Sequence, residues 1–349
     1  MRSDRSVRRR LRVFTWHVHG NYLWYLSQAP HDFFVPFLPG RTDGYGGRSG
    51  SFPWPANLHE VPAAEVARRP FDVILFQTRR NWLEDQHRIL SPPQRALPRI
   101  FLEHDPPLDH PTDQRHPVDD PSVLVVHVTH FNALAWDTGR SPVRVIEHGV
   151  LVPPDVHYTG ELERGIVVIN NLRSRGRRLG ADLFLRARAT VPLDLIGMDA
   201  ESLGGLGEVD PPALRAVEAR YRFLFHPSRW SSLGLAVIEA MSIGMPVVAL
   251  ATTEMSTVLV DGETGFVDTD LGRLCANMRA LLGDRAAARE MGERARKQAI
   301  ERFGIGRFIA DWDAAFNLVA GRRRSFSALA IPATSHGRVH HAQSNRADQ

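Results

Sequence analysis

Short apolar runs recur along this chain of 349 residues, and polar residues or glycine follow each run directly. Such runs are typical of strands that are buried on both faces, as in a parallel sheet between two layers of helices. The pattern predicts an α/β fold with two Rossmann-like halves, in which ligands bind beyond the carboxyl ends of the strands. The predicted strands are residues 12–17, 71–77, 99–102, 123–128 and 143–146 in the first half, and 166–170, 192–197, 223–226 and 247–250 in the second.

The most informative stretch is residues 225–267, which joins a short loop, a helix and a buried strand. The loop at 226–232 leads into an apolar helix at 233–243, and a glycine and a proline then end the helix before the strand. Backbone N–H groups at the start of a helix lack intrahelical partners and carry partial positive charge. A loop that leads into a helix N-terminus therefore suits a phosphate group.

Individual residues of this stretch fit the same interpretation. Gly234 removes a side chain where a ligand has to come close, and Ser231 and Ser232 can cap the helix. Glu239 lies on the second turn, too far into the helix to be a cap. Its carboxylate offers acceptors for sugar hydroxyls that arrive at the helix start.

This stretch resembles the donor-site signature of the retaining family-4 glycosyltransferases, P-S-x-x-E-x-F-G-L-x-x-x-E-A-M-x-x-G-x-P-V-V-A. The family has two glutamates in the pattern E-x7-E, but here position 231 is serine and only Glu239 remains. The residues that match in register are Pro227, Ser228, Gly234, Leu235, Glu239, Ala240, Met241, Gly244, Pro246, Val247, Val248 and Ala249.

The resemblance implies a GT-B architecture, in which two Rossmann-like domains face one another across a cleft. Residues 1–11 are then a basic N-terminal tail, 12–152 an acceptor-side domain and 153–304 a nucleotide-sugar donor domain. Residues 305–320 are expected to form a helix that crosses back to the first domain. Residues 321–349 show no periodicity and are expected to be a disordered tail.

The resemblance also implies which residues hold the donor. In the family, an Arg and a Lys in a loop that reads roughly G-R-x-x-x-x-K-G-x-D hold the diphosphate, and Arg173 and Arg178 are assigned to these places. Their charges, with backbone N–H groups, would stabilise negative charge on the leaving phosphate, so no metal or other cofactor is expected. Glu239 is expected to accept hydrogen bonds from the ribose. The assigned donor site comprises Arg173, Arg178, Ser231, Ser232, Leu233, Gly234, Leu235 and Glu239.

Three residues are assigned to the reaction itself: His104, Glu239 and Glu254. His104 follows an apolar strand and corresponds to the family histidine that contacts the transferred sugar. Glu254 stands where the family usually has Gly-Gly, and we hypothesise that it returns the missing carboxylate to the donor pocket. Glu254→Gln is then expected to reduce turnover much more than stability.

The acceptor side is assigned to His19, Gly20 and Asn21, which follow the first strand. A glycine just after the first strand marks the place where a doubly wound domain admits a ligand. The Gly- and Pro-rich segment 31–55 predicts a long irregular loop near the cleft. The aromatic residues between these segments pack under the sheet or line an acceptor cleft; they are Tyr22, Trp24 and Tyr25.

Composition narrows the class of partner. The single cysteine, Cys275, excludes an intramolecular disulfide and fits a reducing compartment. No apolar run approaches the roughly 20 residues that a membrane-spanning helix needs.

The basic residues bear on charged partners. Lys297 is the single lysine of the chain, so contacts to phosphate groups must be made almost entirely by arginine. The arginine-rich loop has no interleaved aromatic residues, which disfavours nucleic acid, whereas the basic tail suits either solvent or an anionic membrane surface.

The resemblance implies a retaining, metal-independent hexosyltransferase-type enzyme (EC 2.4) that moves a sugar from a nucleotide-diphosphate sugar to a glycan or lipid-linked acceptor. A role in bacterial cell-surface polysaccharide synthesis is expected, in the cytoplasm or peripherally at the inner face of the membrane. Two alternatives stay open. A non-catalytic relative that binds a nucleotide sugar or glycan is favoured by the missing glutamate. A nucleotide-sugar epimerase of similar fold would need a different set of cleft acids.

Overall fold

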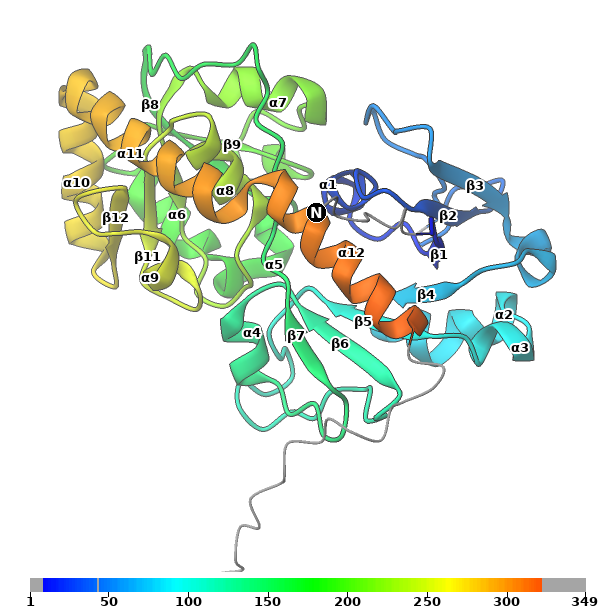
Figure 1. Cartoon of the computed structure of the whole chain (residues 1–349). Helices are drawn as coiled ribbons and strands as arrows, with labels where there is room; N and C mark the ends of the chain where they lie inside the picture. The colour runs from blue at the N-terminus through cyan, green and yellow to red at the C-terminus, as the bar shows by residue number, and fades with distance from the viewer. Residues whose placement is uncertain (1–8, 43, 322–349) are drawn as a thin grey trace, which may run out of the picture.

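Two all-parallel sheets form the centres of two α/β domains in the computed structural model, which describes residues 9–42 and 44–321 (Figure 1). The first sheet has the strand order β3-β2-β1-β4-β5-β6-β7. This order reverses between β1 and β4, which is where a doubly wound sheet opens a crevice for a ligand. The strands are β1 (Arg12–Thr15), β2 (Asp32–Phe37), β3 (Leu58–Pro62), β4 (Val73–Phe76), β5 (Arg99–Glu103), β6 (Val123–His127) and β7 (Val143–Val145).

The second sheet has the order β12-β11-β10-β8-β9, and its direction of winding reverses between β8 and β10. Every residue of β10 and β11 is buried, as expected for central strands of a parallel sheet. The strands are β8 (Leu162–Val168), β9 (Leu193–Ile196), β10 (Tyr221–His226), β11 (Val247–Leu250) and β12 (Gly265–Asp268).

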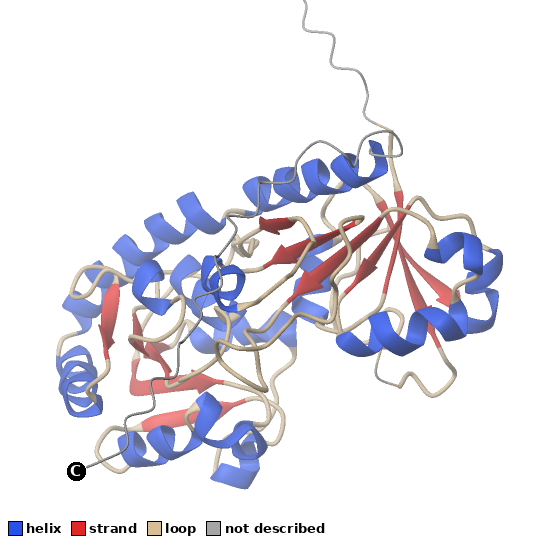
Figure 2. Ribbon diagram, turned by 90° about the horizontal axis from the view of Figure 1, so that it is seen from below, coloured by secondary structure: helices blue, strands red, loops and turns tan. Residues whose placement is uncertain are grey.

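Helices lie on both sides of the strands in each domain (Figure 2). In the first domain they are α1 (Gly20–Leu26), α2 (Gln86–Ile89), α3 (Pro92–Arg95) and α4 (His130–Ala135), with the 3-10 helix η1 (Ala63–Arg68) and the π-helix η2 (Asn81–Asp85). In the second domain they are α5 (Leu172–Leu179), α6 (Ala181–Arg188), η3 (Ala200–Leu203), α7 (Pro211–Glu218), α8 (Leu235–Ser242), α9 (Met255–Val258), α10 (Leu271–Gly283) and α11 (Arg285–Phe303), and α12 (Ile305–Gly321) follows.

The prediction of one irregular loop over residues 31–55 is wrong, because its first part is the strand β2. β2 pairs with β1 on one side and with β3 on the other, and Phe33 and Val35 are fully buried. The many glycines and prolines of residues 39–55 masked the short apolar run D-F-F-V-P-F before them. Pro36 is tolerated because β1 pairs with β2 only as far as Phe34, so at Pro36 the side of β2 that faces β1 is an edge.

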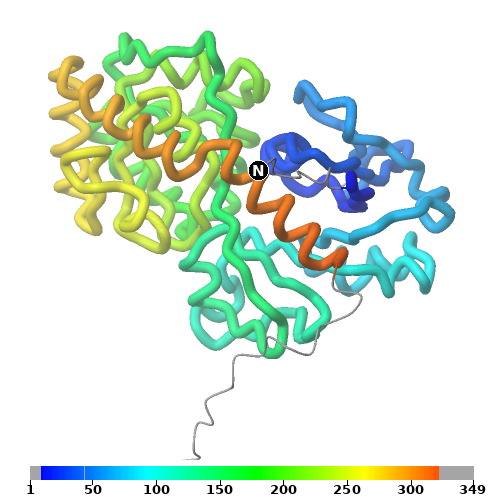
Figure 3. Tube along the Cα trace, in the orientation of Figure 1, coloured from blue at the N-terminus to red at the C-terminus, as the bar shows by residue number. Residues whose placement is uncertain are grey.

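The last helix joins the two domains. The Cα trace in Figure 3 shows α12 leaving the second domain and running over the first. The backbone N–H of Val150, where the chain first leaves the first domain, donates to the Phe303 carbonyl at 2.9 Å. A Cβ at Gly149 would lie 2.2 Å from the Cβ of Phe308 on α12, so only glycine allows this helix to pack so closely. Gly149, between His148 and Val150, therefore has a packing role.

Parts of the expected tails lie outside the described residues, namely 1–8 and 322–349. The described end of the basic N-terminal segment is paired with acidic residues of the first domain. Arg9 contacts Asp72 at 2.8 Å, and Arg10 contacts Asp32 at 3.2 Å. These two arginines are therefore already paired within the domain.

Candidate functional site

A cleft of about 710 Å³ lies between the domains, and both sheets direct their carboxyl ends toward it. From the first domain it is lined by residues that follow β1, β5 and β7, and from the second by residues that follow β8, β9 and β10. All the residues assigned to the donor site line it except Arg173. On the acceptor side His19 and Asn21 line it, whereas Gly20 does not appear in its wall.

The segment from Ser231 to Leu235 forms the loop and first turn of α8 at this cleft. Gly234 has an ordinary φ of −69°, and a Cβ added to it would meet only a ring carbon of His226 at 3.5 Å. The packing of the protein itself therefore does not require glycine at this position. Ser232 is fixed from the opposite domain, because the Asn132 side-chain amide donates to its hydroxyl.

The arginines of the loop after β8 differ from the prediction. Arg173 turns away from the cleft, and its guanidinium donates to the carbonyl of Ser202. Arg178, which was assigned to the donor site, lines the cleft, and Arg175, which was not assigned, lines it as well. Gly176, with φ +56°, interrupts α5 between these two residues and bends the segment. The glycine inside the arginine-rich segment was the sequence signal for this bend, and Arg175 was missed.

Glu239 lies in a buried polar cluster at the base of the cleft, which we call the Glu239 cluster (Tyr25, Arg215, Glu218 and Glu239). The Tyr25 hydroxyl on α1 donates to Glu239 Oε1 at 2.8 Å, so this bond joins the two domains. Arg215 on α7 pairs with Glu239 Oε2 and donates to Glu218 Oε2 at 2.5 Å. All four residues are at least nine-tenths buried. The cluster combines three separate segments of the chain, around Tyr25, Arg215–Glu218 and Glu239, and only Glu239 was assigned to the site from the sequence.

Two carboxylates share one guanidinium in the Glu239 cluster, and this sets its electrostatics. Burial and the neighbouring Glu239 charge raise the pKa of Glu218 to about 7, against the opposing pull of Arg215. Although burial disfavours its charge, Arg215 has a pKa raised above the usual value by Glu218 and Glu239. Burial and Glu239 also raise the pKa of Tyr25, so its hydroxyl stays a hydrogen-bond donor.

The raised pKa of Glu218 predicts how Glu218→Gln changes the pH dependence of stability. Between about pH 4.5 and pH 7 the folded protein keeps a proton on Glu218 that the unfolded chain has released, so wild-type stability falls as the pH rises through this window. Glutamine cannot ionise. Relative to the wild type, the variant should therefore gain on the order of 2–3 kcal/mol between pH 4.5 and pH 8. Urea unfolding at both pH values measures this gain, and an unchanged difference between the two proteins would refute the assignment.

His104 lines the cleft beside His19, with ring centroids 4.5 Å apart. Burial first, then the neighbouring His19 and His148, hold the pKa of His104 well below its usual value, so the ring is neutral. Its Nε2 lies 3.0 Å from Gln77 Oε1, and the Gln77 amide nitrogen donates to the Trp16 carbonyl at 2.8 Å. Gln77 Oε1 is therefore an acceptor, the His104 proton lies on Nε2, and Nδ1 is left as an acceptor.

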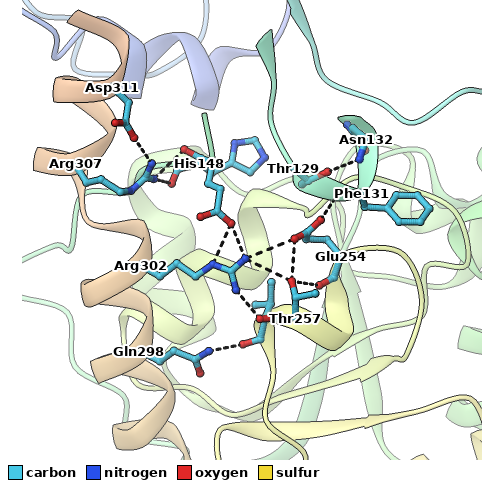
Figure 4. A network of polar contacts seen from close by, with 12 residues as sticks. Thr129, Phe131, Asn132, His148, Glu254, Thr257, Gln298, Arg302, Arg307 and Asp311 are labelled. Atoms are coloured by element: carbon cyan, nitrogen blue, oxygen red, sulfur yellow. Dashed lines mark hydrogen bonds and ion pairs between the residues drawn. The ribbon is translucent and has the colours of Figure 1, made fainter. Parts of the chain in front are cut away.

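Glu254 does not return a carboxylate to the cleft, because it is 2% exposed and lies at the contact between the domains. Figure 4 shows its carboxylate between α4 and α11. It accepts from the backbone N–H of Phe131 at 2.7 Å and from the Thr257 hydroxyl at 2.8 Å, and it lies 3.6 Å from Arg302. The loop after β11 leads directly into α9, which carries Glu254 toward the N-terminus of α4.

This placement reverses the expected effect of Glu254→Gln. The amide would lose the charge that faces Arg302 and the helix start, so we expect a loss of about 1–2 kcal/mol in the free energy of unfolding. Turnover per folded molecule should stay close to the wild-type value. Denaturant unfolding and an assay corrected for folded protein check both statements. Unchanged stability together with lost turnover would instead restore the catalytic hypothesis.

Neither a cluster of metal ligands nor a membrane-spanning helix is present within residues 9–42 and 44–321. No group of three or more His, Cys, Asp or Glu side chains in these ranges is arranged to hold a metal ion. Across the same ranges, no helix combines the length and the apolar character needed to span a membrane.

Part of the second domain matches a known protein family. Residues 202–298, which include β10, α8 and β11, match the family described as Glycosyl transferases group 1. The fold matches sucrose-phosphate synthase from Thermosynechococcus elongatus with a TM-score of 0.66 and 16% identity over 90% of this chain and 100% of that one. HepE from Anabaena, in complex with UDP and glucose, matches with a TM-score of 0.62 and 13% identity over 88% and 100%. The predicted GT-B architecture is confirmed, and the family match supports the predicted glycosyltransferase class.

A further match is to an uncharacterized 41.2 kDa protein in the cps region of Klebsiella pneumoniae. It is 36% identical over 70 residues, which are 20% of this chain and 20% of that protein. The match thus spans about a fifth of the length of that relative.

Proposed function

We propose that this protein is a retaining, metal-independent glycosyltransferase that takes a sugar from a nucleotide-diphosphate sugar. One observation carries the proposal: at the winding reversal of the second sheet, the N-terminus of α8, two arginines and Glu239 face one cleft. The helix start and the arginines suit a diphosphate, and Glu239 suits a ribose diol. Gly234, which the surrounding packing does not require, leaves room for the ligand to approach.

The residues divide the chemistry between the two domains. On the donor side, Arg175, Arg178 and the backbone N–H groups at the start of α8 stabilise the negative charge that builds on the leaving diphosphate. On the other side, the neutral His104 offers Nδ1 to a hydroxyl of the transferred sugar. The acceptor enters past His19 and Asn21.

We further propose that the acceptor is a glycan or a lipid-linked glycan of cell-surface polysaccharide synthesis, at the cytoplasmic face of the membrane. The relative in a cps region supports this class of acceptor. The described residues Arg9 and Arg10 are paired with acidic groups, so attraction to anionic lipid would fall to the arginines that precede them.

A second candidate is a non-catalytic binder of nucleotide sugars. It is favoured by Ser231, which stands in the cleft wall where the resembled family has a glutamate, while Glu254 is committed to the domain contact. Transfer and binding therefore have to be measured separately.

The test of the proposed function is nucleotide release from UDP-, GDP-, ADP- and CDP-sugars, with and without a panel of glycan acceptors. Release from one donor class that a glycan accelerates supports the transferase, and NMR of the product anomer tests retention. If one nucleotide sugar binds but no nucleotide is released with any acceptor of the panel, the result favours the non-catalytic binder over the transferase. The presence or absence of a chelator should make no difference.

A further inference from the structure

A second cavity, of about 560 Å³, lies in the first domain beside the cleft, and we call it the side pocket. It is formed by the loops that follow β1, β2 and β4. It therefore lies at the winding reversal of the first sheet, the place where open α/β sheets bind ligands. Val18 lines both the side pocket and the cleft, so the two spaces adjoin. Its volume is within the range of about 300–1,000 Å³ for small-molecule sites.

The floor of the side pocket is a buried polar network. Asp85, 1% exposed, accepts from the Tyr45 hydroxyl at 3.1 Å and from the Asn81 amide at 2.9 Å. Asn81 is 2% exposed, and its amide oxygen accepts no hydrogen bond from any group in the described part of the chain. Both residues belong to η2, a single π-helical turn of the kind often found at functional sites.

The charges around the side pocket are balanced, which bears on its ligand. Arg41 is held by Glu60 at 2.7 Å and by the Gly46 carbonyl at 2.6 Å. Arg80 lies 3.5 Å from Asp85 through Nε alone, which leaves its terminal nitrogens for a ligand. Among the described residues, two arginines thus face two carboxylates, which leaves no surplus positive charge there to select a phosphate or a carboxylate.

The other residues that line the side pocket indicate which chemical groups its ligand carries. Thr42, Ser49 and Thr78 contribute hydroxyls and His17 an imidazole, and Val18 is the one apolar side chain among the described residues of the wall. The wall is more polar than apolar, so it suits a lipid tail or a nucleobase poorly. Carboxylate, amide, hydroxyl and guanidinium groups together both accept and donate, which matches a neutral molecule with many hydroxyl groups.

We propose that the side pocket is a second saccharide subsite, which holds a neutral sugar unit of a glycan acceptor next to the unit that receives the transferred sugar. The inference rests on the proposed glycosyltransferase function and narrows it, because it makes the acceptor an oligosaccharide of at least two units. Arg80, Asn81 and Asp85 are the residues that bind the distal unit.

The experiment is saturation-transfer NMR and titration of the full chain with neutral disaccharides (maltose, cellobiose, lactose and chitobiose) and with glucuronic acid and glucose 6-phosphate. Arg80→Ala removes a half-exposed side chain from the side pocket and should leave the fold intact. Arg88→Ala is the matched control, because Arg88 is 60% exposed in the same domain and lies outside the pocket wall. Asp85→Asn keeps the shape of the floor and removes its charge.

At least one neutral disaccharide should bind, about tenfold more weakly to Arg80→Ala and Asp85→Asn, and unchanged to Arg88→Ala. The inference is overturned if no neutral disaccharide binds, if these two variants bind as the wild type does, or if the anionic sugars bind more tightly. UDP, GDP, ADP and CDP are titrated into the same samples. If the wild type binds a nucleotide but no disaccharide, this inference alone fails; if it binds no nucleotide, the proposed function fails.

Discussion

Arg215→Met is expected to lower the free energy of unfolding by about 3–5 kcal/mol, because it leaves two buried carboxylates without their cation. Arg215 pairs with both Glu218 and Glu239, and its side chain is only 10% exposed. Methionine fills a similar volume but cannot donate. Chemical denaturation at pH 8, where Glu218 is ionised, gives the largest effect, since its pKa is raised only to about 7.

The matched control is Arg220→Met. Arg220 pairs with Glu161 across a surface where both side chains are about half exposed, so its loss should cost less than 1 kcal/mol. The double variant Arg215→Met, Glu218→Gln should recover part of the lost stability. It has one buried carboxylate without a cation, whereas Arg215→Met alone has two. Equal destabilisation by Arg215→Met and Arg220→Met would show that the buried pairs do not hold the cluster together.

Glu239→Gln is expected to weaken nucleotide binding by about 10- to 100-fold. A hydrogen bond to a charged group contributes about 1.5–3 kcal/mol, and the amide replaces one acceptor oxygen by a donor. Glu239 lines the cleft, so its loss acts directly on the ligand. Calorimetric titration with the nucleotide that the wild type prefers measures the change.

Tyr25→Phe separates the binding role of Glu239 from its structural role. It removes the hydrogen bond of 2.8 Å between the domains and leaves the carboxylate in place. Stability should fall by about 1 kcal/mol, while nucleotide affinity stays within a few-fold of the wild type. If Glu239→Gln binds nucleotide as tightly as Tyr25→Phe does, Glu239 does not contact the ligand.

The fold was largely predictable because its signals are local. Each predicted apolar run contains a strand, and the strands are largely buried except β7 at the end of the first sheet. The glycine and proline after α8 ended the helix where the sequence predicted. The strand β2 was missed because six residues of strand pattern precede a much longer segment rich in glycine. The glycine-rich composition of residues 39–55 thus hid the short apolar run that precedes them.

The candidate site was less predictable because it depends on contacts between distant residues. Tyr25 and Glu239 are 214 positions apart and meet only because α12 and the domain contact bring α1 against α8. Glu254 looked like a cleft acid from its place in the loop, but the short helix α9 directs it to the N-terminus of α4. Arg175 was missed because Gly176 indicates a bend but does not show which arginine the bend turns toward the cleft.

The central claim is that a nucleotide-diphosphate sugar binds at the start of α8 and that Glu239 holds it. The most direct measurement is the thermal stabilisation of the wild type, Glu239→Gln and Tyr25→Phe by UDP, GDP, ADP and CDP and by their sugars. We expect one nucleotide to raise the Tm of the wild type and of Tyr25→Phe selectively, and to leave that of Glu239→Gln almost unchanged. No shift with any nucleotide, or an equal shift in all three proteins, would contradict the claim.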